Sequence, residues 1–264
     1  MNPLRVSLLQ TDIAWENKQE NLRRLRAKLK TLRGQTDVAI LPETFSTGFS
    51  MNPAALAEPT DGNTLTTLRR WAAEYRMALA GSYIACDTPA TQVFHNRAFF
   101  LTPEGESRFY DKRHLFRMGH ETDCYTPGKE RLVVHYKGWN ICLLVCYDLR
   151  FPVWSRNRHN EYDLLIYVAN WPASRRKVWD ILLQARALEN ISYVCGVNRI
   201  GEDIHGILHD GGSVAWSPPK GERLAYVPDH AEGIATVTLD GDALQHFREK
   251  FPAWKDADDF SIIK

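Results

Sequence analysis

The chain has 264 residues, with 33 Lys and Arg against 32 Asp and Glu, and a formal net charge of +1. Hydrophobic residues make up 44% and charged residues 25%, a composition typical of a folded globular protein and unlike a disordered chain. The near-zero charge, with Arg175-Arg176-Lys177 as the main basic cluster, argues against nucleic-acid binding. No apolar run approaches the ~20 residues that span a bilayer. We expect a single domain over residues 1–264.

The five cysteines do not indicate a disulfide framework, because their number is odd and there is no CxxC pair. Cys86, Cys142 and Cys195 lie in apolar, strand-like segments, which favours a reducing, cytoplasmic location. We expect no metal and no cofactor. His205 and His209 are four residues apart but have no third ligand in pattern, so we expect them in a solvated loop.

Apolar periodicity in the N-terminal part predicts strands that alternate with amphipathic helices. Leucines at positions 22, 25, 29 and 32 share one face of a helix predicted over residues 21–32. A second helix is predicted over residues 65–77, with Leu65, Leu68, Ala72 and Tyr75 together. Strands are predicted over residues 4–10, 38–41, 78–86 and 93–102.

The second half repeats this alternation, which favours an α/β layered fold. A helix is predicted over residues 178–191, and Asp242 is expected to cap a final helix, with Gln245 in the capping-box position. The apolar side chains that share one face of the 178–191 helix are Val178, Ile181, Leu182, Ala185 and Leu188. Strands are predicted over residues 132–135, 141–146, 164–169, 193–198, 213–216 and 234–239.

Three strand-like segments are followed by a reactive side chain, and strand ends are where α/β folds place ligands and catalytic groups. Glu43 follows Ala39–Pro42, Lys112 follows Phe109–Asp111, and Cys146 follows Leu143–Val145. A buried thiol needs a base or a cation to act as a nucleophile, and a carboxylate in an apolar pocket can be that base. Taken singly, each residue also fits a structural role, as a small core side chain, a loop acid or a solvated lysine.

Together the three segments are more specific. Leu-Pro-Glu-Thr-Phe (41–45), Tyr-Asp-Lys-Arg-His-Leu-Phe (110–116) and Cys-Tyr-Asp-Leu-Arg-Phe-Pro (146–152) resemble the nitrilase, or carbon–nitrogen hydrolase, superfamily. The resemblance implies a four-layer α-β-β-α sandwich and a Glu43-Lys112-Cys146 triad. It also implies a second glutamate in the site, for which Glu121 is the best match.

The segments 147–152, 154–157 and 168–172 look like the bacterial omega-amidase branch of that superfamily. That resemblance implies hydrolysis of the terminal amide of 2-oxoglutaramate or 2-oxosuccinamate to a 2-oxo dicarboxylate and ammonia. The reaction would pass through a thioester on Cys146, with Lys112 and the Tyr147 backbone N–H holding the oxyanion. Arg150 is the candidate for the substrate carboxylate, or it pairs with an acid of the scaffold. Phe116, Met118 and Trp171 are the candidate apolar walls.

Other functions are also compatible with the sequence. The chain is either this amidase, a relative that acts on a nitrile, an N-carbamoyl amino acid or glutamine, or a non-hydrolytic protein in which Cys146 is a sensor thiol. The expected partner is a small amide. We also expect a homodimer or a higher homo-oligomer, with a C-terminal tail (about 252–264) packing on a neighbouring subunit.

Overall fold

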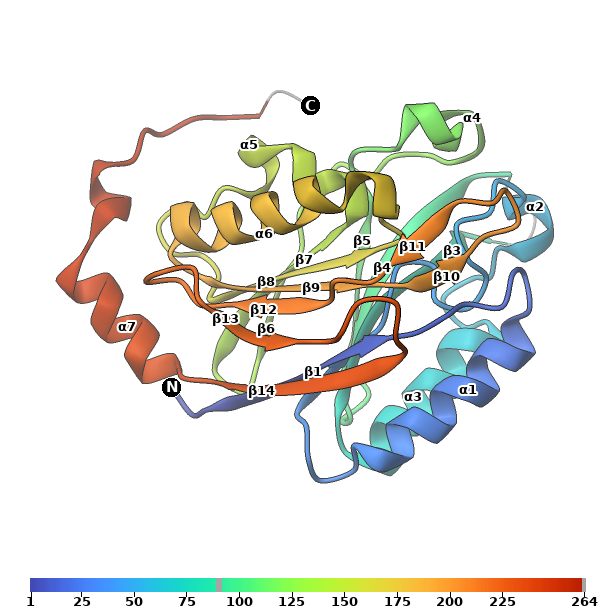
Figure 1. Cartoon of the computed structure of the whole chain (residues 1–264), viewed down its shortest axis with the longest axis horizontal. Coiled ribbons are helices and arrows are strands. Elements are labelled where there is room, and N and C mark those ends of the chain that lie inside the picture. The colour runs from blue at the N-terminus through green and yellow to red at the C-terminus, as the bar shows by residue number, and fades with distance from the viewer. Residues whose placement is uncertain (89–91, 263–264) are drawn as a thin grey trace.

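Two six-stranded sheets are stacked face to face, and helices cover the outer face of each (Figure 1). This computed structural model describes residues 1–88 and 92–262. The four-layer α-β-β-α sandwich implied by the resemblance is therefore confirmed. No helix in the described part of the chain is long and apolar enough to cross a bilayer.

The first sheet has a parallel centre, β1 to β3, flanked by antiparallel strands. Its order is β14 (Gly233–Leu239), β1 (Leu4–Gln10), β2 (Val38–Ile40), β3 (Ala78–Cys86), β4 (Phe94–Leu101) and β5 (Ser107–Asp111). Helices α1 (Lys18–Thr31) and α3 (Asn63–Tyr75) connect the parallel strands and cover the outer face (Figure 1).

The second sheet has the same design, with β7, β8 and β9 as its parallel centre. Its order is β13 (Arg223–Tyr226), β12 (Val214–Trp216), β9 (Tyr193–Asn198), β8 (Leu164–Ala169), β7 (Trp139–Val145) and β6 (Val133–Tyr136). Helices α5 (Pro152–Ser155) and α6 (Arg176–Asn190) lie over its outer face, and β10 (Ile200–Glu202) pairs with β11 (Leu208–Asp210) as a separate hairpin.

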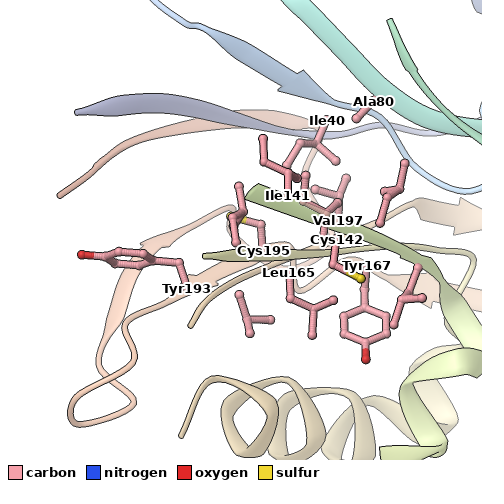
Figure 2. Packing of buried hydrophobic residues seen from close by; sticks show 14 of the residues in the cluster. Ile40, Ala80, Ile141, Cys142, Leu165, Tyr167, Tyr193, Cys195 and Val197 are labelled. Carbon is pink, nitrogen blue, oxygen red and sulfur yellow. The ribbon is translucent and has the colours of Figure 1, made fainter. Parts of the chain in front are cut away.

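Apolar side chains fill the space between the two sheets. Figure 2 shows Ile40 and Ala80 of the first sheet facing Ile141 and Val197 of the second. Alternate residues of β8 point the other way, toward α6, as Tyr167 does. Because side chains alternate along a strand, β8 and β9 each contribute to two apolar layers and are buried throughout.

The helices α1 and α3 bury the faces that their periodicity predicts, but α6 does not. The predicted stripe includes Ile181 and Leu188, which are 54% and 44% exposed. The buried face instead carries Trp179, Leu183, Arg186, Ala187 and Asn190. The prediction was wrong because it followed apolar residues only, and this helix buries an arginine that donates to the Leu149 carbonyl.

The last helix, α7 (Gly241–Lys250), is capped by Asp240, whose side chain accepts from the Ala243 N–H at 2.9 Å. The prediction of Asp242 as the cap was wrong, because Asp242 lies inside the first turn and pairs with the N-terminal amine of Met1. Short turns complete the chain: α2 (Pro53–Leu56), α4 (Glu121–Cys124) and the 3-10 turns at 117–119, 146–150, 173–175 and 253–256.

A buried ion pair fastens α7 to the second sheet. Arg248 donates to Asp163 at 2.6 Å and to the carbonyls of Tyr162 and Ile191 at 2.7 and 3.0 Å. Arg248 and Asp163 are both almost fully buried. Removing one partner of such a pair leaves an uncompensated charge away from water.

We therefore expect Arg248→Met to lower the free energy of unfolding by about 3–5 kcal/mol. Urea denaturation at pH 7 measures this change. Lys250→Met is the matched control, because Lys250 is exposed at the end of the same helix. An equal loss of stability in both variants would contradict the assignment.

Candidate functional site

The carboxyl ends of strands from both sheets meet at one cavity of about 270 Å³. Glu43 follows β2, Cys146 follows β7 and Asn170 follows β8, while Lys112 comes directly after β5. All four line the cavity. The structure thus brings together the three side chains that the sequence singles out, from positions up to 103 residues apart.

A buried cluster of one ammonium and two carboxylates lies at the floor of the cavity. Glu43 and Lys112 line the cavity, whereas Glu121 does not and contacts the cluster from within the protein. Lys112 Nζ donates to Glu43 Oε1 at 2.9 Å and to both oxygens of Glu121 at 3.0 and 2.9 Å. Glu43 and Glu121 are fully buried and Lys112 is 1% exposed. Because an unpaired charge at this depth is strongly unfavourable, the three groups stabilise one another only as a set.

Two asparagines fix the carboxylates. Asn96 on β4 donates to Glu43 at 2.7 Å and to Glu121 at 3.1 Å. Asn170 donates its backbone N–H to Glu43 Oε2 at 2.8 Å and its side-chain amide to the Glu43 carbonyl at 2.7 Å. Glu121 also accepts from the Phe116 N–H at 2.5 Å. Each carboxylate is therefore held in one orientation by several donors.

The pKa values of the two glutamates are shifted in opposite directions. Burial alone would raise the pKa of Glu43, but the Lys112 charge and the hydrogen bonds from Lys112, Asn170 and Asn96 lower it overall. Burial raises the pKa of Glu121, and Lys112 offsets this only in part because the charge of Glu43 raises it further. Burial lowers the pKa of Lys112, yet both carboxylates outweigh that effect and raise it. Glu43 is thus the better placed of the two to stay ionised and to accept a proton.

Cys146 stands on a sharp turn from β7 into the 146–150 turn, with φ of 44°. That left-handed conformation is unfavourable for a residue with a side chain, so the surrounding structure has to hold it. Asp148 does so from a fully buried position, accepting from the Val145 N–H at 3.0 Å and from Tyr110 Oη at 2.8 Å. It also accepts from the His114 N–H at 3.0 Å, which joins this turn to the segment after Lys112.

The thiol of Cys146 is protonated at neutral pH. Burial raises its pKa well above the ordinary value, and the charge of Glu43 and a hydrogen bond to Glu43 raise it further, against the opposing charge of Lys112. The Cys146 side chain is half-buried and lines the cavity. A neutral thiol beside an ionised carboxylate is the resting state expected for a nucleophile that is activated by a general base.

The residues predicted as walls all line the cavity, at different depths. Trp171 is 3% exposed, whereas Met118 is 84% exposed and so lies at the rim. Phe116 and Tyr147 form an edge-to-face pair with ring centroids 5.1 Å apart. Arg150 is exposed and its guanidinium lies 5.4 Å from the Trp171 ring centroid, with no acid of the described chain in ion-pair distance. The alternative in which Arg150 pairs with a scaffold acid is not what the structure shows.

Sequence reasoning missed several cavity residues. His209 was expected in a solvated loop, but it is buried on β11, and His205 also lines the cavity. Burial and the charge of Arg199 lower the pKa of His209 to about 4, so it is neutral at pH 7. Arg175, which the sequence shows only as part of a basic cluster, lines the cavity as well. The described residues include no group of three or more His, Cys, Asp or Glu that suits a metal ion.

Comparisons with known proteins agree with this fold and cluster. The Carbon-nitrogen hydrolase family model matches residues 5–249, so the chain belongs to that family. It is an omega-amidase-like member of the nitrilase superfamily, an amidase that acts on carbon–nitrogen bonds other than peptide bonds.

The relatives extend over the whole chain. "Omega-amidase YafV" of Yersinia enterocolitica is 45% identical and covers 100% of both chains. "2-oxoglutaramate amidase" of Bacillus subtilis is 27% identical over 95% of this chain and 96% of its own. A CN-hydrolase superfamily protein from Xanthomonas campestris, solved with an arsenic adduct in its active site, has a TM-score of 0.95, with 40% identity over 99% of this chain and 100% of its own.

The charge of Glu43 raises the pKa of Cys146, so we expect its removal to lower that pKa. In Glu43→Gln, the rate of Cys146 alkylation by iodoacetamide should rise at a lower pH than in the unaltered protein, as followed by mass spectrometry. Glu58→Gln is the matched control, a partly buried glutamate that pairs with Lys18. No shift would show that Glu43 does not control the thiol, and a shift to higher pH would contradict the view that the charge of Glu43 raises the Cys146 pKa.

Proposed function

We propose that this protein hydrolyses the terminal amide of a small 2-oxo acid amide, 2-oxoglutaramate or 2-oxosuccinamate, through a thioester on Cys146. The observation that carries the proposal is the contact between Lys112, Glu43 and Glu121 at the floor of a cavity that the thiol also lines. The relatives named omega-amidase and 2-oxoglutaramate amidase support the choice of substrate.

In the proposed reaction Glu43 takes the proton of the Cys146 thiol as sulfur attacks the amide carbonyl carbon. The oxyanion that forms is held by Lys112 Nζ and the backbone N–H of Tyr147, and each such donor typically contributes ~3–4 kcal/mol. Collapse breaks the carbon–nitrogen bond, and Glu43 returns the proton to the leaving nitrogen, which departs as ammonia. Glu43 then removes a proton from water, the hydroxide attacks the thioester, and the acid product and the thiol are released.

Glu121 has a positioning role in this proposal. It accepts two hydrogen bonds from Lys112 and holds the ammonium beside Glu43. Because the Glu121 carboxylate also binds Lys112, Lys112 stays charged through the cycle, including the step in which Glu43 is protonated. The oxyanion therefore meets a fixed positive charge rather than one that titrates.

The alternative of a sensor thiol is disfavoured by the electrostatics of Cys146. Thiols that respond to oxidants are accessible and have a low pKa, because the thiolate is the reactive form. Here burial and Glu43 raise the pKa of Cys146. Hydrolysis of a nitrile, an N-carbamoyl amino acid or glutamine stays an alternative for the same site, and a carbamoyl substrate would release carbon dioxide with the ammonia.

We expect Cys146→Ala to lower ammonia release from 2-oxoglutaramate by at least about 10³-fold, as for loss of a nucleophile in other hydrolases. A coupled ammonia assay measures the rate, and mass spectrometry of the unaltered protein under turnover detects the acyl adduct on Cys146. Cys124→Ala is the control, because Cys124 lies outside the cavity and bonds only to the Met51 carbonyl. Wild-type rates in the alanine variant would rule out this nucleophile.

We also propose that the chain works as one domain, over residues 1–264, in a homo-oligomer. Pairing of β14 with β1 along seven residues joins the two ends of the chain and supports the single domain. The described part of the tail contacts its own chain, where Arg158 donates to the Phe260 carbonyl, so its packing on a second subunit stays a prediction. All five cysteines are free thiols, and the cytoplasmic location stays a prediction too.

The outer face of α5 and α6 suits a second copy of this chain, because Val153, Ile181 and Leu188 are exposed there. We expect Ile181→Asp to shift the protein toward monomer in sedimentation velocity, since a charge would be buried in an apolar contact. Leu224→Asp, at an exposed apolar position on β13, is the control. An unchanged assembly in the Ile181 variant would place the interface elsewhere.

A further inference from the structure

The three consecutive basic residues at the start of α6, Arg175 to Lys177, have different surroundings. Arg176 donates to Asp180 at 2.8 Å and to Asp229 at 2.6 Å, and lies 3.4 Å from Asp210. Lys177 is exposed to solvent. Arg175, by contrast, lines the cavity, and no acid of the described chain lies within ion-pair distance of it.

Arg175 rests on an aromatic wall of the cavity. Its guanidinium lies 5.2 Å from the centroid of the Phe116 ring, a cation–π contact. Its backbone is fixed as well, since its carbonyl accepts from Trp171 Nε1 at 2.8 Å and its N–H donates to the Pro172 carbonyl at 3.0 Å. A guanidinium that contacts the face of a ring can still direct its N–H donors to an anion.

Arg150 is arranged in the same way on the neighbouring wall. Its guanidinium lies 5.4 Å from the Trp171 ring centroid, and this is the same indole that binds the Arg175 carbonyl. Trp171 therefore links the two arginines. Both belong to the rim side of the cavity, because Arg150 is exposed and Arg175 half-buried, whereas Glu43 and Lys112 form the floor.

The other charges of the cavity already have partners. Glu43 accepts from Lys112, and Arg199 donates to Asp12 at 2.9 Å. Asp203 accepts from two backbone N–H groups of its own loop, those of His205 and Ile207. The cavity lining therefore carries two guanidiniums that have no ion-pair partner in the described chain, against the single carboxylate of Asp203.

We propose that Arg175 is a specificity-determining residue that holds, together with Arg150, a carboxylate of the substrate at the rim while the amide reaches Cys146. This inference rests on the proposed amidase function and assigns the residues that select an amide with a negative charge remote from the reacting carbon. Guanidinium–carboxylate pairs are strong and directional, so neutral amides of the same length bind far less well.

The test compares three five-carbon amides: 2-oxoglutaramate, glutaramate, which lacks the 2-oxo group, and pentanamide, which lacks the charge. We expect Arg175→Met to lower kcat/KM for the two anionic amides roughly 10- to 100-fold, mainly through KM, as for loss of a charged hydrogen bond. The rate with pentanamide should stay within about twofold, because its binding involves no carboxylate. Arg175→Lys should restore part of the loss, and Lys177→Met should have no effect.

Several results would overturn the inference. Equal losses of kcat/KM for all three amides would show that Arg175 has only a structural role. An unchanged kcat/KM for the anionic amides would show that Arg175 does not bind the substrate carboxylate. A wild-type preference for pentanamide would contradict the charged rim. If the wild type releases ammonia from none of the amides, the proposed function fails. Calorimetric measurement of 2-oxoglutarate binding then tests separately whether Arg175 binds a carboxylate. Weaker binding in Arg175→Met would support the inference, and equal binding would reject it.

Discussion

The site depends on the ammonium of Lys112 being held between the carboxylates of Glu43 and Glu121. None of these groups is stable in the interior alone, and together they are stable only with the amide donors of Asn96 and Asn170. The set fixes one charged arrangement in a buried floor, where each electrostatic interaction is stronger than in water. Burial raises the pKa of the Cys146 thiol, and the neighbouring Glu43 carboxylate raises it further because it opposes a second negative charge.

The fold explains why such distant residues meet. Each sheet has three parallel central strands, and the carboxyl ends of both sets open toward the same cavity. One sheet supplies the base after β2 and the cation after β5, and the other supplies the nucleophile after β7 and Asn170 after β8. The buried carboxylate of Asp148 joins the two parts, since it bonds to the Tyr110 hydroxyl of the first sheet and to the Val145 N–H of the second.

The sequence predicted most of the elements because apolar periodicity is local. Glu43, Lys112 and Cys146 were identified because each follows a strand-like segment and the three segments together resemble one family, whereas each residue alone also fits a structural role. The face of α6 was not identified, because Arg186 is buried there and bonds to the Leu149 carbonyl, a partner 37 residues away. Asn170 was missed for the same reason: its hydrogen-bond partner Glu43 is 127 residues away, and a local pattern does not reveal such a distant partner. Arg175 and Arg176 are adjacent and identical in type, and only the fold reveals that one is neutralised and the other is open.

The floor and the rim of the cavity have different roles in the proposed reaction. At the floor, the proton that Cys146 gives up passes to Glu43 and later to the leaving nitrogen, so no group there needs to exchange protons with bulk water during acylation. At the rim, the two guanidiniums without an ion-pair partner attract an anion. A neutral thiol at rest and two guanidiniums at the entrance favour the same kind of ligand. An anionic amide is attracted by the rim, and the neutral thiol does not repel it before the attack begins.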